Sequence, residues 1–63
     1  MTLEEIKAAV LAGRVVHWAS SLYTVQVDKL GQWLIMCKNG WCVGLTWRDG
    51  VTLNGAESQF YAE

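Results

Sequence analysis

The chain contains no proline among its 63 residues, and charged side chains make up only 17% of it. Without proline every residue keeps a backbone N–H donor, so nothing in the sequence forbids a continuous meander of strands. Five basic and six acidic side chains give a formal net charge of -1. This balance provides no basic patch for phosphates and no acidic surface that imitates a nucleic acid backbone. The composition therefore argues against nucleic acid as the main partner.

Long hydrophobic runs and targeting signals are also missing. The longest strongly apolar run, Trp33 to Cys37, is far too short to span a bilayer. The first residues, Met1 to Glu5, are acidic rather than basic, and no long apolar core follows as in a signal peptide. These features predict a cytoplasmic protein with reduced thiols and no membrane association.

Hydrophobic residues make up 52% of the chain, which argues against disorder and predicts a single folded domain over residues 1–63. A chain of this length lies near the lower limit for independent folding. Such a core supplies only about 3–5 kcal/mol, and small domains often add disulfides, metals or self-association. A homodimer is therefore one arrangement to test.

Several helix-start signals agree at the beginning of the chain. Thr2 and Glu5 have the T-x-x-E spacing of a capping box, and Gly13 suits the position just after a helix end. Apolar residues recur at helical spacing along one face: Leu3, Ile6, Ala9 and Val10. These signals predict a helix over about residues 3 to 12.

Strand signals fill most of the remaining sequence. Val15 to Ala19 is β-branched and aromatic and ends at a polar Ser-Ser pair, and Leu22 to Val27 alternates between apolar and polar residues. Val51 to Leu53 predicts a further short strand, and Phe60-Tyr61 is expected to dock a polar tail onto the core. The sequence therefore predicts an α+β fold, with one N-terminal helix packed on a bent antiparallel β-meander of four to five strands.

The segment from residue 32 to residue 47 holds three of the four tryptophans and both cysteines, and it predicts a hairpin with two possible registers. A two-residue turn at Asn39-Gly40 would place Cys37 opposite Cys42, close enough for a strained disulfide. A three-residue loop, Lys38 to Gly40, would instead pair Cys37 with Trp41 and put the two sulfurs on opposite faces.

The three-residue loop is favoured because it gathers the bulkiest side chains on one face, and burial of one face sets the register. That face carries Trp33, Ile35, Cys37, Trp41, Val43, Leu45 and Trp47. We expect the helix to pack there, with the tryptophans filling the core. The other face remains half apolar, which is typical of a partner or dimer surface. Its residues Leu34, Met36 and Thr46 are candidate binding residues.

The sequence offers little for catalysis or metal binding. His17 is the only histidine and could in principle activate Ser20 or Ser21, but no nucleophile elbow surrounds them. His17, Cys37 and Cys42 provide three potential zinc ligands where a structural site normally takes four. We therefore expect no enzyme activity, no metal and no cofactor, and interpret His17 as a structural residue.

Exposed tryptophans could instead stack the bases of a single-stranded nucleic acid. Trp18, Trp41 and Trp47 are the candidates for such stacking, although the basic side chains are too few and too scattered to favour it. Single-stranded nucleic acid binding is therefore the alternative function. Trp18 and Arg48 complete the set of candidate binding residues.

Four stretches of the chain carry a resemblance: Thr2 to Ile6, Val16 to Trp18, Gly31 to Ile35 and, most strongly, Gly44 to Gly55. They resemble small accessory proteins encoded on bacterial plasmids, prophages and related mobile elements. Such proteins commonly bind and block a host machine, such as a CRISPR–Cas complex or a restriction system. The resemblance implies a non-catalytic protein-binding module, an anti-CRISPR-like inhibitor whose partner is a larger host protein or complex, and it transfers no catalytic residue.

Overall fold

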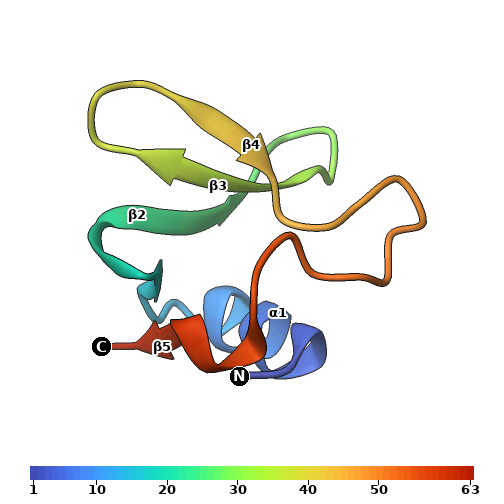
Figure 1. The fold of residues 1–63 in the computed structure, drawn as a ribbon, viewed down its shortest axis with the longest axis horizontal. Coiled ribbons are helices and arrows are strands. Elements are labelled where there is room, and N and C mark those ends of the chain that lie inside the picture. The colour runs from blue at the N-terminus through green and yellow to red at the C-terminus, as the bar shows by residue number, and fades with distance from the viewer.

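The computed structural model describes all 63 residues and has one α-helix packed on a five-stranded antiparallel sheet (Figure 1). The sheet is not closed, and its strands lie in the order β4-β3-β2-β1-β5. The predicted α+β fold is therefore confirmed. The elements are α1 (Leu3–Leu11), β1 (Val16–Trp18), β2 (Ser20–Val27), β3 (Trp33–Cys37), β4 (Cys42–Gly44), the 3₁₀ helix η1 (Glu57–Gln59) and β5 (Phe60–Ala62).

Helix α1 begins and ends where its capping residues require. The backbone N–H of Glu5 donates to Thr2 Oγ1 over 3.2 Å, and the N–H of Thr2 donates to Glu5 Oε1 over 2.8 Å. At the other end Gly13 has φ 85, and its N–H donates to the Val10 carbonyl over 3.0 Å. The next N–H, that of Arg14, returns to Ala9, which completes a Schellman-type stop. The predicted capping box and helix are thus confirmed.

The sheet bends sharply between β1 and β2, because a single residue makes the reversal. Ala19 has φ 64, and the neighbouring Trp18 and Ser20 are paired with each other. Between Trp18 and His17 the pairing register shifts, so that His17 lies opposite Thr24. Strand β2 therefore starts at Ser20, two residues before the strand that the alternating pattern predicts.

The β3–β4 hairpin has the three-residue loop that the distribution of bulky residues favours. Met36 pairs with Cys42, the N–H of Cys37 donates to the Trp41 carbonyl over 2.7 Å, and the N–H of Gly40 donates to the Cys37 carbonyl over 2.9 Å. Gly40 has φ 96, a conformation that glycine adopts without strain. Cys37 and Cys42 thus lie on opposite faces of the sheet, and both are free thiols.

The core lies between α1 and the face of the sheet that was predicted to be covered. Its buried members are Ile6, Ala9, Val16, Val25, Ile35, Leu45 and Phe60. Trp33 is only half-buried at the margin of this core, where Lys7 Nζ lies 5.5 Å from its ring centroid.

The prediction that the tryptophans fill the core is wrong for two of them. Trp41 is 50% exposed, because it lies at the turn of the hairpin, beyond the elements that α1 contacts. Trp47 is 65% exposed, because β4 ends at Gly44 and the chain then leaves the sheet.

The last third of the chain also differs from expectation. No strand forms over residues 51–53, and only Leu53 makes a bridge, with Thr46. The expected docking tail is instead a fifth strand: Phe60 pairs with Trp18 and Tyr61 with His17 in β1. The side chain of Phe60 is buried in the core, so β5 is an integral part of the fold.

Candidate functional site

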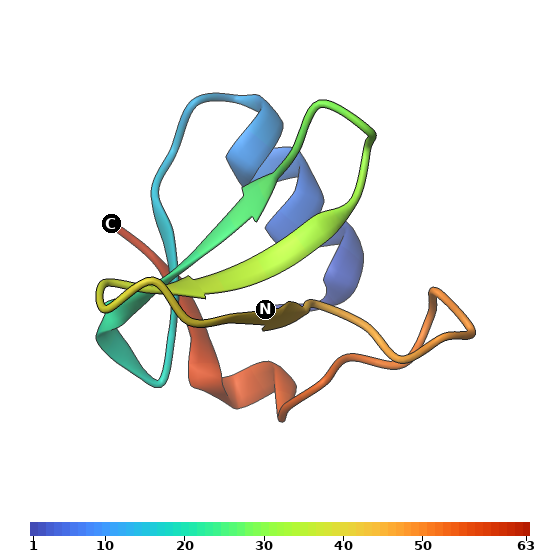
Figure 2. The same ribbon diagram turned by 90° about the horizontal axis from the view of Figure 1, so that it is seen from above.

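The most prominent surface feature is a loop that extends away from the sheet, formed by residues 46–53 and called here the tip loop (Figure 2). Its base is closed by the bridge between Thr46 and Leu53 and by an Asn54 N–H that donates to the Leu45 carbonyl over 2.9 Å. Further out, the N–H of Trp47 donates to the Thr52 carbonyl, also over 2.9 Å. The tip loop is therefore a short irregular hairpin tied together by backbone hydrogen bonds.

Asp49 fixes the conformation of the outer part of the tip loop. Its Oδ1 accepts from the N–H of Val51 over 2.9 Å and from the N–H of Thr52 over 3.0 Å, and its Oδ2 accepts from the Thr52 hydroxyl over 2.7 Å. The N–H groups of Thr52 and Val51, followed by that hydroxyl, lower the pKa of Asp49. Because the carboxylate is used within the loop, the loop has a defined shape without any partner.

The tip loop presents two large apolar side chains to solvent. Trp47 is 65% exposed and Val51 is 72% exposed. Arg48 is exposed between them and forms no ion pair, since the single ion pair in the structure joins His17 to Glu63. An aromatic ring, an aliphatic side chain and an unpaired cation therefore lie together on one ordered loop.

A second surface is the face of the sheet opposite α1. The strand pairing places Thr24, Met36 and Cys42 in one row and Gln26, Leu34 and Gly44 in the next, and none of these six residues is charged. Leu34 and Met36 share this outer face, whereas Thr46 lies beyond the end of β4; all three residues are half-buried. Their role in binding stays a prediction.

The five candidate residues taken from the sequence do not form one site. Leu34 and Met36 lie on the outer face, Thr46 lies at the base of the tip loop, and Arg48 lies in its outer part. Trp18 is separate from all of them and packs against the core. In sequence, Thr46 lies between the outer-face residue Gly44 and the outer part of the tip loop.

Trp18 has little room to receive a ligand. Its Nε1 donates to Gln59 Oε1 over 3.1 Å. Gly55 packs so closely against the same ring that a Cβ at position 55 would lie only 2.7 Å from this nitrogen. Its ring packs edge-on against Tyr23, with 5.0 Å between ring centroids, and Tyr23 in turn contacts Trp41 at 6.2 Å. Trp18 therefore belongs to an aromatic row at the margin of the core.

The favoured interpretation of the sequence placed Trp47 on the covered face, because it extended the alternating pattern through Trp47; only the base-stacking alternative had this residue exposed. Sequence reasoning did not identify Val51 as a surface residue. The signal that marks the departure is Arg48-Asp49-Gly50, whose aspartate and glycine favour a turn directly after Trp47. An aspartate before a glycine favours a local side-chain-to-backbone turn, and such a turn exposes its apolar neighbours.

His17 is buried, with only 5% of its surface exposed, and makes no contact with a serine hydroxyl. Its Nδ1 lies 2.9 Å from the Tyr23 carbonyl, and its Nε2 lies 2.6 Å from Glu63 Oε1. Ser20 Oγ instead accepts from the Leu22 N–H over 3.3 Å. The hydrogen bond to Glu63, then that to the Tyr23 carbonyl, raises the pKa of His17.

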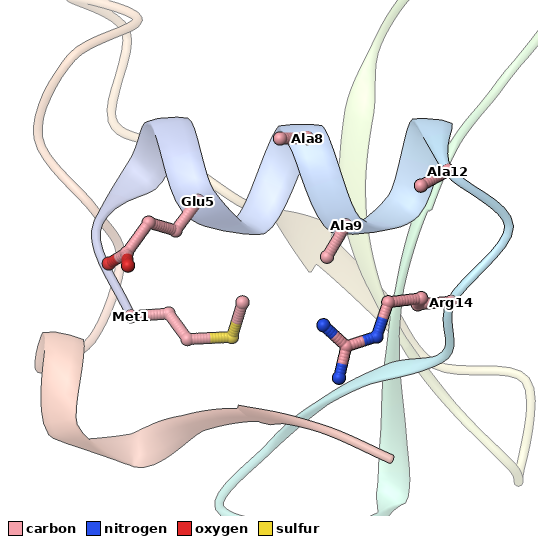
Figure 3. A pocket seen from close by; sticks show the side chains of 6 residues that line it. All are labelled: Met1, Glu5, Ala8, Ala9, Ala12 and Arg14. Carbon is pink, nitrogen blue, oxygen red and sulfur yellow. The ribbon is translucent and has the colours of Figure 1, made fainter.

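The structure has one hollow, of about 370 Å³, which lies along α1 and is open to solvent (Figure 3). Its lining residues are Met1, Glu5, Ala8, Ala9, Ala12 and Arg14. Its three charged groups all have other partners: Glu5 caps the helix, Arg14 donates to the Glu63 carbonyl over 3.3 Å, and the Met1 ammonium donates to the Glu57 carbonyl over 2.6 Å. The hollow therefore offers no unpartnered reactive group.

No group of three metal-ligating side chains is brought together anywhere in the fold. The only α-helix has nine residues, which is too short to cross a bilayer. Comparison of the chain with known protein families, with curated proteins and with solved structures found no match in any of the three.

Proposed function

We propose that the protein is a non-catalytic binding module that engages a larger protein partner through the tip loop. One observation carries this proposal: Trp47 and Val51 are both strongly exposed on a loop whose backbone is already ordered by Asp49. A loop that is ordered before binding loses little conformational entropy on association. Exposed tryptophan and arginine are also the residue types that most often dominate interface energies.

The chemistry of the tip loop indicates what the partner surface has to provide. Trp47 and Val51 need an apolar cleft, and Arg48 needs a carboxylate, because Asp49 is already occupied by the loop. A partner site with an apolar centre and an acidic rim meets both needs.

The outer face adjoins the tip loop in sequence, because Gly44 in one of its rows lies two residues before Thr46 at the base of the loop. Leu34 and Met36 add half-buried apolar area, and their direct partners on β2 and β4 are uncharged. The same area would serve a homodimer, and a strict monomer in sedimentation at micromolar concentration would exclude that arrangement.

Within this class, we propose an anti-CRISPR-like inhibitor of a host defence complex, acting in the bacterial cytoplasm. Support for this finer proposal comes from the resemblance to small mobile-element proteins. The stretch of strongest resemblance, Gly44 to Gly55, includes the whole tip loop.

Capture of partners from a lysate of the native bacterial host tests both proposals. Trp47→Ala is compared with Trp41→Ala, a matched control that removes an exposed tryptophan from the far hairpin. We expect the wild type and Trp41→Ala to capture the same Cas or nuclease subunit. Trp47→Ala should capture at least about tenfold less of this subunit than the wild type, which is the loss expected on truncation of an interface hot spot.

Two results of that comparison count against the proposal. Capture of no protein by the wild type contradicts a protein-binding function. Equal capture by the two variants, with both shown to be folded by circular dichroism, removes the tip loop as the binding surface.

Single-stranded nucleic acid binding is the second candidate, and the exposure of Trp47 beside Arg48 favours it. An exposed ring and an adjacent cation are the elements of a base-stacking site. Quenching of tryptophan fluorescence by short oligonucleotides, weakened by added salt, would support this function in place of the first.

A further inference from the structure

His17 is the only buried polar residue in the chain, and it lies at the junction of three strands. His17 belongs to β1. It pairs with Thr24 of β2 on one side and with Tyr61 of β5 on the other. Both ring nitrogens are used, one towards the Tyr23 carbonyl and the other towards the carboxylate of Glu63.

These two contacts require two protons on the ring. A neutral imidazole has one N–H, whereas a carbonyl and a carboxylate are both acceptors. With only one proton, one of the two short contacts, at 2.9 Å and 2.6 Å, would bring a ring lone pair against an acceptor oxygen. The imidazolium donates to both oxygens, so the geometry fits the charged form of His17.

The two acceptors come from parts of the chain that are far apart in sequence. Tyr23 belongs to β2, and Glu63 directly follows β5. Protonated His17 therefore joins the end of β5 to β2 across the intervening strand β1. This connection matters for the fold because β5 places Phe60 in the core.

We propose that His17, the Tyr23 carbonyl and Glu63 form a proton-dependent latch that holds β5 on the sheet. When the proton leaves, His17 can donate to only one of the two oxygens, and its charge attraction to the Glu63 carboxylate is lost. The Glu63 side chain is already 63% exposed, so it turns into solvent without a rearrangement of the core. Strand β5 is then held by its backbone pairing with β1 and by Phe60.

The charged groups around the latch act in opposite directions. Glu63, after β5, favours the imidazolium, whereas Lys38, in the β3–β4 loop, and the burial of the ring oppose it. The centroid of the Tyr61 ring lies 5.3 Å from that of the His17 ring, and the two rings are tilted by 39°. Arg14 donates to the Glu63 backbone carbonyl, and α1 packs on the other face of the sheet.

The direction of the pH effect follows from the raised pKa of His17. Its folded value lies above the ordinary value of 6.5, so the latch contributes fully below pH 6.5. That contribution is lost as the pH rises through the folded pKa. Strand β5 should therefore be held more tightly in weakly acid than in weakly alkaline solution.

Nuclear magnetic resonance on the intact chain measures both parts of the latch. The ring resonances of His17 give its pKa, and amide exchange, corrected for the intrinsic pH dependence of exchange, gives protection at Tyr61 and Glu63. Between about pH 6 and about pH 9, we expect a severalfold fall in the protection of these two amides. Protection of α1, measured at Ala9, should not fall.

Glu63→Gln removes the charge of the latch and retains a side-chain oxygen, and Glu57→Gln is the matched control on η1, away from His17. We expect Glu63→Gln to return the pKa of His17 towards 6.5 and to abolish the pH dependence at Tyr61, while Glu57→Gln leaves both unchanged. Both substituted side chains are exposed, so both variants should fold.

Three outcomes would overturn the latch: a wild-type His17 pKa at or below 6.5, β5 protection independent of pH, or identical behaviour of the two variants.

Discussion

At the residue scale, the shape of the tip loop depends on the carboxylate of Asp49, which accepts hydrogen bonds from two backbone N–H groups and one hydroxyl of the same loop. The neighbouring Arg48 forms no ion pair with it. One aspartate thus has two effects: it orders the backbone that presents Trp47 and Val51, and it leaves a cation free for a partner. The two effects are linked, because the carboxylate that orders the loop is the one directly next to Arg48 in sequence.

Asp49→Ala should loosen the tip loop without unfolding the protein. We expect faster amide exchange at Val51 and Thr52 and weaker partner capture, with a change in the free energy of unfolding of less than about 0.5 kcal/mol, as for most surface positions. Asp28→Ala is the matched control, because Asp28 Oδ1 accepts in the same way from the N–H groups of Leu30 and Gln32 in the β2–β3 turn. Partner capture that falls equally in both variants would contradict this role of Asp49.

In the wild-type protein, the protection of the Val51 and Thr52 amides against hydrogen exchange should also depend on pH. The pKa of Asp49 is lowered from 3.8, so the ordering of the loop is complete above that value. It should be lost only as the pH falls through the lower folded value.

At the scale of elements, the β3–β4 hairpin was predictable because its two faces differ so much in bulk. A shift of one residue would move Cys42 and Gly44 to the covered face in place of Val43 and Leu45. Burial excludes that register, and Gly40 accommodates the loop that the other register needs. The end caps of α1 were predictable for a similar reason, since Thr2, Glu5 and Gly13 each act on neighbours in sequence.

The tip loop and β5 were not predictable, because they depend on contacts between distant residues. The Leu45 N–H still donates to the Trp33 carbonyl in register with β3, and the chain leaves the sheet only after this residue. Asn54, nine residues further along the chain, then donates from Nδ2 to the Gly44 carbonyl. Strand β5 is three residues long with a single buried side chain, and only its pairing with β1 makes it a strand. No local pattern contains that information.

The hairpin register makes a direct prediction about the two thiols. In the folded protein, a mild oxidant should leave Cys37 and Cys42 without a bond between them, because their side chains lie on opposite faces. Mass spectrometry after alkylation measures this, and the same treatment in denaturant is the control, in which the flexible chain should form the bond. Rapid formation of the bond in the folded state would mean that the other register is populated.

At the scale of the whole molecule, the fold has only two layers and therefore little redundancy. Only 8 of 63 residues are buried, and seven of these form the hydrophobic core. The helix covers one face of the sheet and leaves the other available for binding. The surface that supports the proposed function is thus available because the domain has no third layer, and the same lack of a layer limits its stability.

Removal of one core side chain should consequently be enough to unfold the domain. Ile35 is fully buried at the centre of the sheet, and Ile35→Ala should cost about 2–5 kcal/mol, which approaches the total stability of so small a domain. Ile35→Val should cost only about 0.5–1.5 kcal/mol and remain folded. Leu30→Ala, in an exposed turn, controls for loss of an apolar side chain without loss of the core. Urea unfolding followed by circular dichroism measures all three variants. A folded Ile35→Ala protein with nearly unchanged stability would show that another layer, such as a second copy on the outer face, supports the sheet in solution.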